Sequence, residues 1–175
     1  MKSIVLVLAL SATIAFSAAR TDVQAQEAEA SAQSATRLVG RWVLQVDRLP
    51  MPPETRPKAV TLEFAQVADG RWRSRVDITG PDGTPMASES TLALDGTSGR
   101  ATGSYAVDTV AAKVPAPDVL VMQFVYQGIP RSTRVYTVNA DASELTETEG
   151  YARPDGTPVL RTAVFTREAA SRTGQ

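Results

Sequence analysis

The stretch WRSRVDITGPDGTPMASESTLAL, which runs from Trp72 to Leu94, alternates apolar and polar residues on both sides of a central turn. In its first half, Trp72, Val76 and Ile78 alternate with polar residues, which is typical of a strand with one face on a core and the other in water. The central PDGTP of residues 81–85 supplies the positive φ of a tight hairpin through its Asp-Gly pair. The stretch therefore predicts a β-hairpin.

The same alternation and turn chemistry recur along the chain after residue 37. The PDGTP turn is repeated at residues 154–158, and no segment here shows a convincing helical period. Two proline-rich connections, residues 49–57 and 114–117, are expected to be loops because proline cannot donate to a strand ladder. Strands are expected over residues 38–46, 60–64, 72–79, 88–94, 100–107, 119–126, 131–138, 145–151 and 159–167. We therefore predict an all-β fold, an antiparallel up-and-down meander of about eight to ten strands that closes into a barrel.

The N-terminal segment has the pattern of a secretory signal peptide. Lys2 precedes an apolar block over residues 4–16, which is about 13 residues long where a bilayer span needs about 20. The mature protein is therefore expected to be periplasmic or secreted, without insertion into a membrane. The expected segments are a signal peptide over residues 1–25, a flexible leader over 26–37, one barrel domain over 38–168 and a C-terminal tail over 169–175.

The composition excludes several classes of site. The chain contains no histidine and no cysteine, and its formal net charge is −1. It cannot form a Ser-His-Asp triad, a Cys-His pair, a histidine zinc site or a disulfide. A nearly neutral chain also lacks the basic surface that binding to nucleic-acid phosphates requires. We therefore expect no metal, no cofactor and no nucleic-acid partner, and the sequence identifies no protein partner.

Short motifs on the first and last expected strands carry a family resemblance. The first strand contains Gly40-Arg41-Trp42, and the last strand ends at Arg167. A Gly-x-Trp motif with a basic residue on the last strand resembles the calycins, the group of ligand-binding barrels that includes lipocalins and streptavidin. The resemblance implies a lipocalin-like barrel in which Trp42 plugs one end and Arg167 stacks over its ring. The chain departs from the lipocalins because a tight turn joins its last two strands, without their C-terminal helix, and because their Thr-Asp-Tyr motif is absent.

Two groups of charged residues are candidate sites. Glu147 and Glu149 lie two apart on one expected strand, so their carboxylates share a face, as a pair of catalytic carboxylates would. The interpretation that we favour is a polar strand face in contact with water. Arg71, Arg73 and Arg75 form either an anion-binding patch or, as we favour, the water-facing side of their strand.

Three arginines on the later strands are further candidates for binding an acidic ligand group. They are Arg131, Arg134 and Arg161. The alternation around Arg134 is mixed, so an inward and an outward orientation are both open.

Small and large residues alternate on the expected inward rows. Ser74, Ser90 and Gly103 lie among larger side chains, so they either leave space for a ligand or fill a tapered barrel. Residues suited to line a cavity are Leu62, Phe64, Val76, Ile78, Leu92, Tyr105, Met122, Phe124 and Tyr126. The ligand-binding residues that we predict are Phe64, Ile78, Tyr105, Met122, Phe124, Tyr126, Arg134 and Tyr136.

These patterns favour a non-enzymatic exported binding protein. Its barrel would hold a small, mostly apolar ligand, oriented by a tyrosine or an arginine near the mouth. The first alternative is a filled barrel that acts as an envelope or interaction domain and takes no small molecule. A lesser alternative is a carboxylate-based enzyme, which needs Glu147 or Glu149 to be buried in a cleft.

Overall fold

The chain folds into a closed barrel in which every strand pairs with its neighbour in the sequence. The computed structural model describes residues 37–169, so the predicted signal peptide, the leader before Arg37 and the tail from residue 170 lie outside these residues. Three short 3-10 segments are η1 (Val46–Arg48), η2 (Pro53–Thr55) and η3 (Ala68–Gly70). The strands are β1 (Gly40–Leu44), β2 (Ala59–Gln66), β3 (Trp72–Thr79), β4 (Pro85–Leu92), β5 (Asp95–Gly103), β6 (Thr109–Ala116), β7 (Val119–Tyr126), β8 (Ile129–Val138), β9 (Glu144–Ala152) and β10 (Pro158–Arg167).

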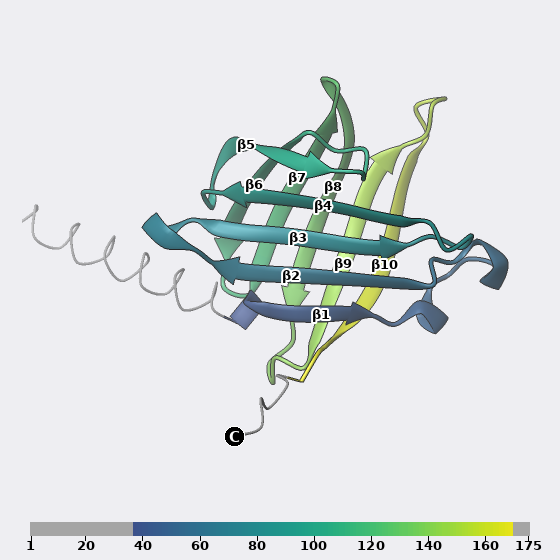
Figure 1. Cartoon of the computed structure of the whole chain (residues 1–175), viewed down its shortest axis with the longest axis horizontal. Helices are drawn as coiled ribbons and strands as arrows, with labels where there is room; N and C mark the ends of the chain where they lie inside the picture. Colours follow the sequence, from purple (N-terminus) through teal and green to yellow (C-terminus); the bar gives the residue numbers. More distant parts are fainter. Residues whose placement is uncertain (1–36, 170–175) are drawn as a thin grey trace, which may run out of the picture.

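Closure occurs between the first and the last strand. β10 pairs antiparallel with β1, and Trp42 lies opposite Arg167 in this pairing. In Figure 1, β1–β4 cross over β7–β10 at a steep angle, so the two groups of strands face each other around one interior. The predicted all-β antiparallel meander and its barrel are confirmed.

The hairpin turns form as the two PDGTP sequences predict. Gly83 and Gly156 adopt positive φ values of 92° and 83°. In each turn the aspartate side chain accepts a hydrogen bond from the backbone N–H two residues later, from Thr84 in the first and from Thr157 in the second. Local turn chemistry therefore joins β3 to β4 and β9 to β10.

One strand was missed by the sequence analysis, and the expected loop over residues 114–117 is wrong. The described residues contain ten strands. Of the strand expected over residues 100–107, only residues 100–103 are in a strand, the end of β5, and β6 occupies residues 109–116, where no strand was expected. Pro115 lies within β6 at a shift of register, between the pairs that Lys113 and Ala116 make with β7. At such an irregularity a missing N–H leaves no ladder bond broken.

The end of the barrel around Trp42, which we call the capped end, is densely packed. Trp42 is fully buried, and its indole N–H donates to the carbonyl of Leu38 at 2.9 Å. The guanidinium of Arg167 lies 4.1 Å from the centre of the Trp42 ring. The buried apolar core of the barrel as a whole also includes Leu44, Leu62, Phe64, Trp72, Leu92, Leu120, Leu145 and Phe165.

Arg167 is held by backbone groups alone at its polar edge. Its guanidinium donates to the carbonyls of Arg37, Val39 and Ala142 at 2.5–2.7 Å. Gly40 has a φ of 139°, and a Cβ at this position would overlap the Arg167 guanidinium. The glycine of the Gly-x-Trp motif thus makes room for the arginine. The structural roles predicted for Trp42 and Arg167 are confirmed.

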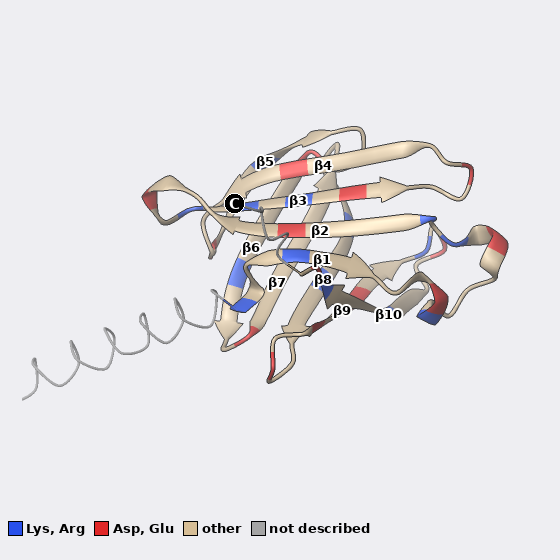
Figure 2. Cartoon of the chain, turned by 60° about the horizontal axis from the view of Figure 1, so that its bottom comes forward, with Lys and Arg blue, Asp and Glu red and all other residues tan. Residues whose placement is uncertain are grey.

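The arginine row on β3 faces water, as we favoured. Arg73 pairs with Glu63 on β2, and Arg75 pairs with Asp77 and Glu89. Figure 2 shows acidic and basic positions alternating across β1–β4. Because neighbouring carboxylates neutralise the arginines, this outer face is not a basic patch.

Candidate functional site

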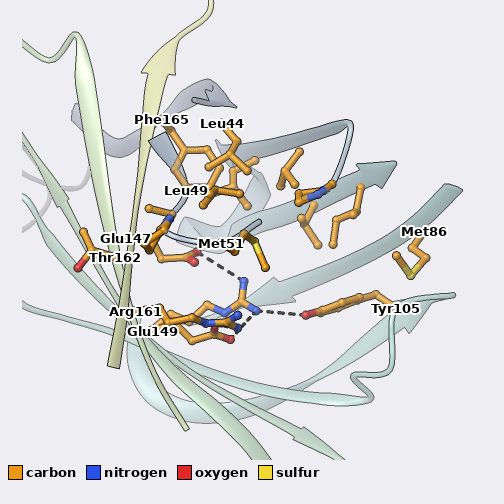
Figure 3. Close-up of a pocket in the computed structure, with 18 residues that line it drawn as sticks. Leu44, Leu49, Met51, Met86, Tyr105, Glu147, Glu149, Arg161, Thr162 and Phe165 are labelled. Atoms are coloured by element: carbon orange, nitrogen blue, oxygen red, sulfur yellow. Dashed lines mark hydrogen bonds and ion pairs between the residues drawn. The ribbon is translucent and has the colours of Figure 1, made fainter. Parts of the chain in front are cut away.

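The opposite end of the barrel, which we call the hollow end, contains a cavity of about 280 Å³. Side chains from the ends of β1 and β3, the beginnings of β2 and β4 and the middle of β10 line it. The connection between β1 and β2 folds over one side (Figure 3). The apolar lining residues include Leu44, Leu49, Pro50, Met51, Pro57, Val60, Leu62, Val76, Ile78, Met86, Ala163 and Phe165.

One part of the cavity wall is charged. It consists of Arg134 on β8, Glu147 and Glu149 on β9, and Arg161 on β10, which we call the charged cluster. In the strand register Arg134 and Arg161 both lie opposite Glu149, so three adjacent strands bring opposite charges together. The sheet pairing itself therefore builds the cluster.

The charged cluster contains one short ion pair and two longer ones. Arg161 Nη2 lies 2.7 Å from Glu149 Oε2, and Arg134 Nη2 lies 3.1 Å from Glu149 Oε1. The contact between Arg134 Nη1 and Glu147 Oε2 is longer, at 3.5 Å. The side chains of Arg134, Glu147 and Glu149 are only 14, 10 and 14% exposed, whereas Arg161 is 47% exposed. The cluster thus runs from the barrel interior to its rim.

Arg134 is positioned by three strands and one connection. Its Nη2 also donates to the hydroxyl of Tyr105 at 3.2 Å, and its guanidinium lies 5.0 Å from the centre of the Phe124 ring. Its Nε is buried and has no hydrogen-bond partner among the described residues. Buried polar atoms without partners are rare in proteins. The hydrogen bonding of Arg134 is therefore incomplete within the chain itself.

The electrostatics of the cluster keep Arg134 and Glu149 ionised. Burial by itself lowers the pKa of Arg134, but Tyr136, Glu147, Tyr105 and Glu149 together raise this pKa well above its usual value. Burial by itself raises the pKa of Glu149, yet the charges and hydrogen bonds of Arg134 and Arg161 outweigh it and leave this pKa below its usual value. At neutral pH the cluster therefore contains a guanidinium and a carboxylate in contact.

Tyr136 lies opposite Glu147 in the pairing of β8 with β9, and its hydroxyl is uncharged at neutral pH. Burial raises the pKa of its hydroxyl well above the usual value, and the negative charge of Glu147 raises it further. The ring packs edge-on against Phe64 at a centroid distance of 5.5 Å. Tyr136 therefore joins the packed core of the capped end to the polar wall of the cavity.

The favoured interpretation of Glu147 and Glu149 as a water-facing strand face is wrong. Both share the inward row with Leu145, and Glu147 is only 8% exposed. The sequence misled because β9 is polar on both faces, so its own alternation does not show which row points inward. Complementary arginines on β8 and β10 are the only sequence signal, and their proximity depends on strand pairing.

Five of the predicted ligand-binding residues line the interior spaces. Ile78, Tyr105 and Arg134 line the main cavity. Phe124 and Tyr136 line a smaller adjoining space of about 20 Å³, which Arg134 and Tyr105 also border. A space of this size has room for about one water molecule. The open question about Arg134 is answered, because its side chain points inward.

The other three predicted residues do not line these spaces. Phe64 and Met122 are each 1% exposed and are part of the packed core. Tyr126 lies at the end of β7 and borders neither the main cavity nor the smaller adjoining space. Ser74 and Ser90 line the smaller space, whereas Gly103 packs against the backbone of Ala87.

Residues of the connection between β1 and β2 were missed. Leu49, Pro50, Met51 and Pro57 line the cavity although residues 49–57 were expected only to form a loop. The one available signal was the apolar and proline-rich composition of this loop, because leucine and methionine are uncommon in loops that are fully exposed to water. Its inward position depends on contacts with the rest of the barrel.

Residues 37–169 contain no membrane-spanning helix and no cluster of metal ligands. No helix in this range is long and apolar enough to cross a bilayer. Within the same range, no three histidine, cysteine, aspartate or glutamate side chains are placed to hold a metal ion.

Comparison with solved structures finds chains of similar shape. No family model matches the chain, and no curated protein matches its sequence. Among solved structures, the fluorescent protein UnaG is similar, with 17% sequence identity and a TM-score of 0.45. The match covers 77% of this chain and 99% of the UnaG chain. We therefore infer the function from the cavity and its lining residues.

Proposed function

We propose that this protein is an exported, non-enzymatic binding protein that holds a small, mostly apolar molecule in the cavity at the hollow end. The observation that carries the proposal is a space of about 280 Å³ with an apolar wall and one charged cluster. Ligand pockets in proteins combine these two features, because apolar burial supplies affinity and a few polar groups fix orientation.

The size of the cavity limits the ligand. A cavity of about 150 Å³ holds a benzene molecule, so this space has room for an alkyl chain of medium length or two fused rings. Removing about 200 Å² of apolar ligand surface from water contributes roughly 5 kcal/mol, before the cost of lost motion. Affinities in the micromolar range are therefore within reach when the polar end of the ligand is also satisfied.

The two alternatives fit the geometry less well. A filled barrel would leave no interior space much larger than a water molecule. A carboxylate enzyme would have Glu147 or Glu149 buried in a cleft, and both are. However, Arg134 contacts both carboxylates, and the pKa of Glu149 is below its usual value, so it is not a proton donor at neutral pH. These contacts support binding over catalysis.

The binding proposal is tested by native mass spectrometry of protein purified from its own host, followed by melting curves with 1-decanol. We expect either a copurified small molecule or a rise in melting temperature with the alcohol, because a ligand that binds only the folded state stabilises it. Ala163→Phe, which fills the cavity, is expected to abolish the rise. Val164→Phe, on the outward side of the same strand, is the matched control and should retain it.

Two outcomes would overturn the binding proposal. One is a clean mass of the bare chain together with a melting temperature that 1-decanol leaves unchanged. The other is an equal rise for the Ala163→Phe variant, because a molecule that still stabilises the filled barrel binds elsewhere.

The export proposal depends on the pattern of residues 1–25. We expect the protein recovered from its host to begin after this segment and to be found in the periplasm or the medium. Mass spectrometry of the mature N-terminus checks this, and a mature chain that still carries these residues in the cytoplasm would contradict it.

A further inference from the structure

We propose that the bound ligand carries an uncharged polar group that both donates and accepts hydrogen bonds, such as a hydroxyl or a carboxamide, in place of a carboxylate or an ammonium group. This inference rests on the proposed function, because it concerns the head group of a molecule held in the same cavity.

The first argument is the charge balance of the cavity. Its described lining residues include two arginines, Arg134 and Arg161, and two glutamates, Glu147 and Glu149, so the formal charges sum to zero. A carboxylate or ammonium group beside Arg134, Glu147 and Glu149 would be a fifth charge without a counter-charge, next to side chains that are only 10–14% exposed. An uncharged head group leaves the balance intact.

The second argument is the competition that a charged head group would face. A ligand carboxylate must take Arg134 away from Glu147 or Glu149, and a ligand ammonium must take a glutamate away from Arg134. A carboxylate that takes Arg134 from Glu147 leaves that buried glutamate without its one ion pair among the described residues, which is strongly unfavourable. An exchange at Glu149 is less unfavourable, because Arg161 still pairs with it. The charge of Arg134 is therefore already matched within the chain, even though its Nε has no hydrogen-bond partner among the described residues.

The third argument is the hydrogen-bonding capacity that remains. Glu147 makes one ion pair with the described residues, at 3.5 Å, and accepts a hydrogen bond from the hydroxyl of Tyr136. A carboxylate has more acceptor positions than these two contacts use, so Glu147 still has capacity to accept a hydrogen bond. The hydroxyl of Tyr105 lies on the other side of the Arg134 guanidinium, because it accepts from Nη2 whereas Glu147 contacts Nη1 (Figure 3). A hydroxyl or carboxamide that donates to Glu147 and accepts from Tyr105 or Arg134 uses this capacity without changing any charge.

The test is a series of probes that share a ten-carbon chain and differ in the head group: 1-decanol, decanamide, decanoate and decylammonium. Dissociation constants are measured at pH 7 and moderate salt by isothermal titration calorimetry on the folded mature protein. We expect 1-decanol or decanamide to bind at least tenfold more tightly than both charged probes, a difference of about 1.4 kcal/mol. A preference below tenfold, or tighter binding of either charged probe, overturns the inference and leaves the proposed function standing. Absence of binding by all four probes overturns both.

A charge variant gives an independent reading of the same inference. Glu147→Gln keeps the shape of the side chain and removes one negative charge from the cavity wall, so decanoate is expected to bind at least tenfold more tightly than to the unmodified protein. Decylammonium should gain nothing. An unchanged affinity for decanoate would count against the role of charge balance.

The matched control is Glu63→Gln on the outer face of β2. It changes the formal net charge of the protein by the same amount, but Glu63 pairs with Arg73 outside the barrel. We expect it to leave all four affinities unchanged, and a gain for decanoate in this variant would also overturn the inference. The comparison among probes on the unmodified protein stands even if a variant fails to fold.

Discussion

Each end of this barrel has an arginine stacked on an aromatic ring, but the two arginines have different roles. At the capped end, Arg167 stacks on the indole ring of Trp42, and at the hollow end Arg134 lies over the ring of Phe124. Arg167 donates its hydrogen bonds to backbone carbonyls, whereas Arg134 donates to glutamate and tyrosine side chains. The backbone carbonyls of the surrounding chain already accept the hydrogen bonds of Arg167, so this arginine has a structural role in closing the barrel. Side-chain partners can be rearranged or shared, so Arg134 belongs to a wall that another molecule can contact.

The two ends also differ in how far side chains fill the interior of the barrel. Large buried apolar side chains such as Phe64 and Trp72 pack around Trp42. At the hollow end the opposite walls do not meet, and a space of about 280 Å³ remains. Stability should therefore depend most on the capped end, and selectivity on the hollow end.

The largest effect is expected for Trp42→Ala at the capped end. It removes a fully buried ring and the surface on which Arg167 stacks, so we expect a loss of about 3–5 kcal/mol in the free energy of unfolding. Denaturation by urea measures the loss. A decrease below about 1 kcal/mol would show that the capped end does not dominate stability.

A smaller effect is expected for Arg134→Met at the hollow end. It leaves Glu147 and Glu149 buried without this partner, and the breaking of a buried ion pair is destabilising by about 3–5 kcal/mol when burial is complete. Because the side chains retain 10–14% exposure, we expect a smaller loss, roughly 2–3 kcal/mol. Addition of Glu147→Gln should restore part of this stability in a double-mutant cycle. Purely additive losses would mean that the two residues do not interact.

The smallest effect concerns the pH dependence of stability. The pKa of Glu149 is lower in the folded protein than its usual value of 4.5, so its ionised form stabilises the fold above about that pH. This stability is lost as the pH falls through the folded pKa. The stability difference between the unmodified protein and Glu149→Gln should therefore shrink on acidification from pH 6 to pH 3. Melting temperatures across this range measure it, and a difference that grows on acidification would contradict the assignment.

Much of the architecture could be predicted from the sequence because its signals are local. The alternation of Trp72, Val76 and Ile78 and the two PDGTP turns each act over a few residues, and both were found as predicted. β6 was missed because Pro115 argues against a strand, and only the pairing with β7 shows that the proline lies at an irregularity.

The candidate site was only partly predictable. Arg134, Tyr105 and Ile78 were identified as binding residues, and all three line the cavity. Glu147 and Glu149 were assigned to the wrong face, because a strand that is polar on both sides does not indicate its own orientation. Met51 was missed because the position of a loop depends on what it packs against.

By itself, the sequence determined that the chain alternates, turns and closes. These features follow from backbone geometry and turn chemistry, which act between neighbours along the chain. The roles of Trp42 and Arg167 were implied by the resemblance of the Gly-x-Trp motif to the calycins. Only the tertiary structure decided that Arg134, Glu149 and Arg161 meet inside the barrel. They lie on three separate strands, and the register that places them opposite one another arises only when the whole sheet has formed.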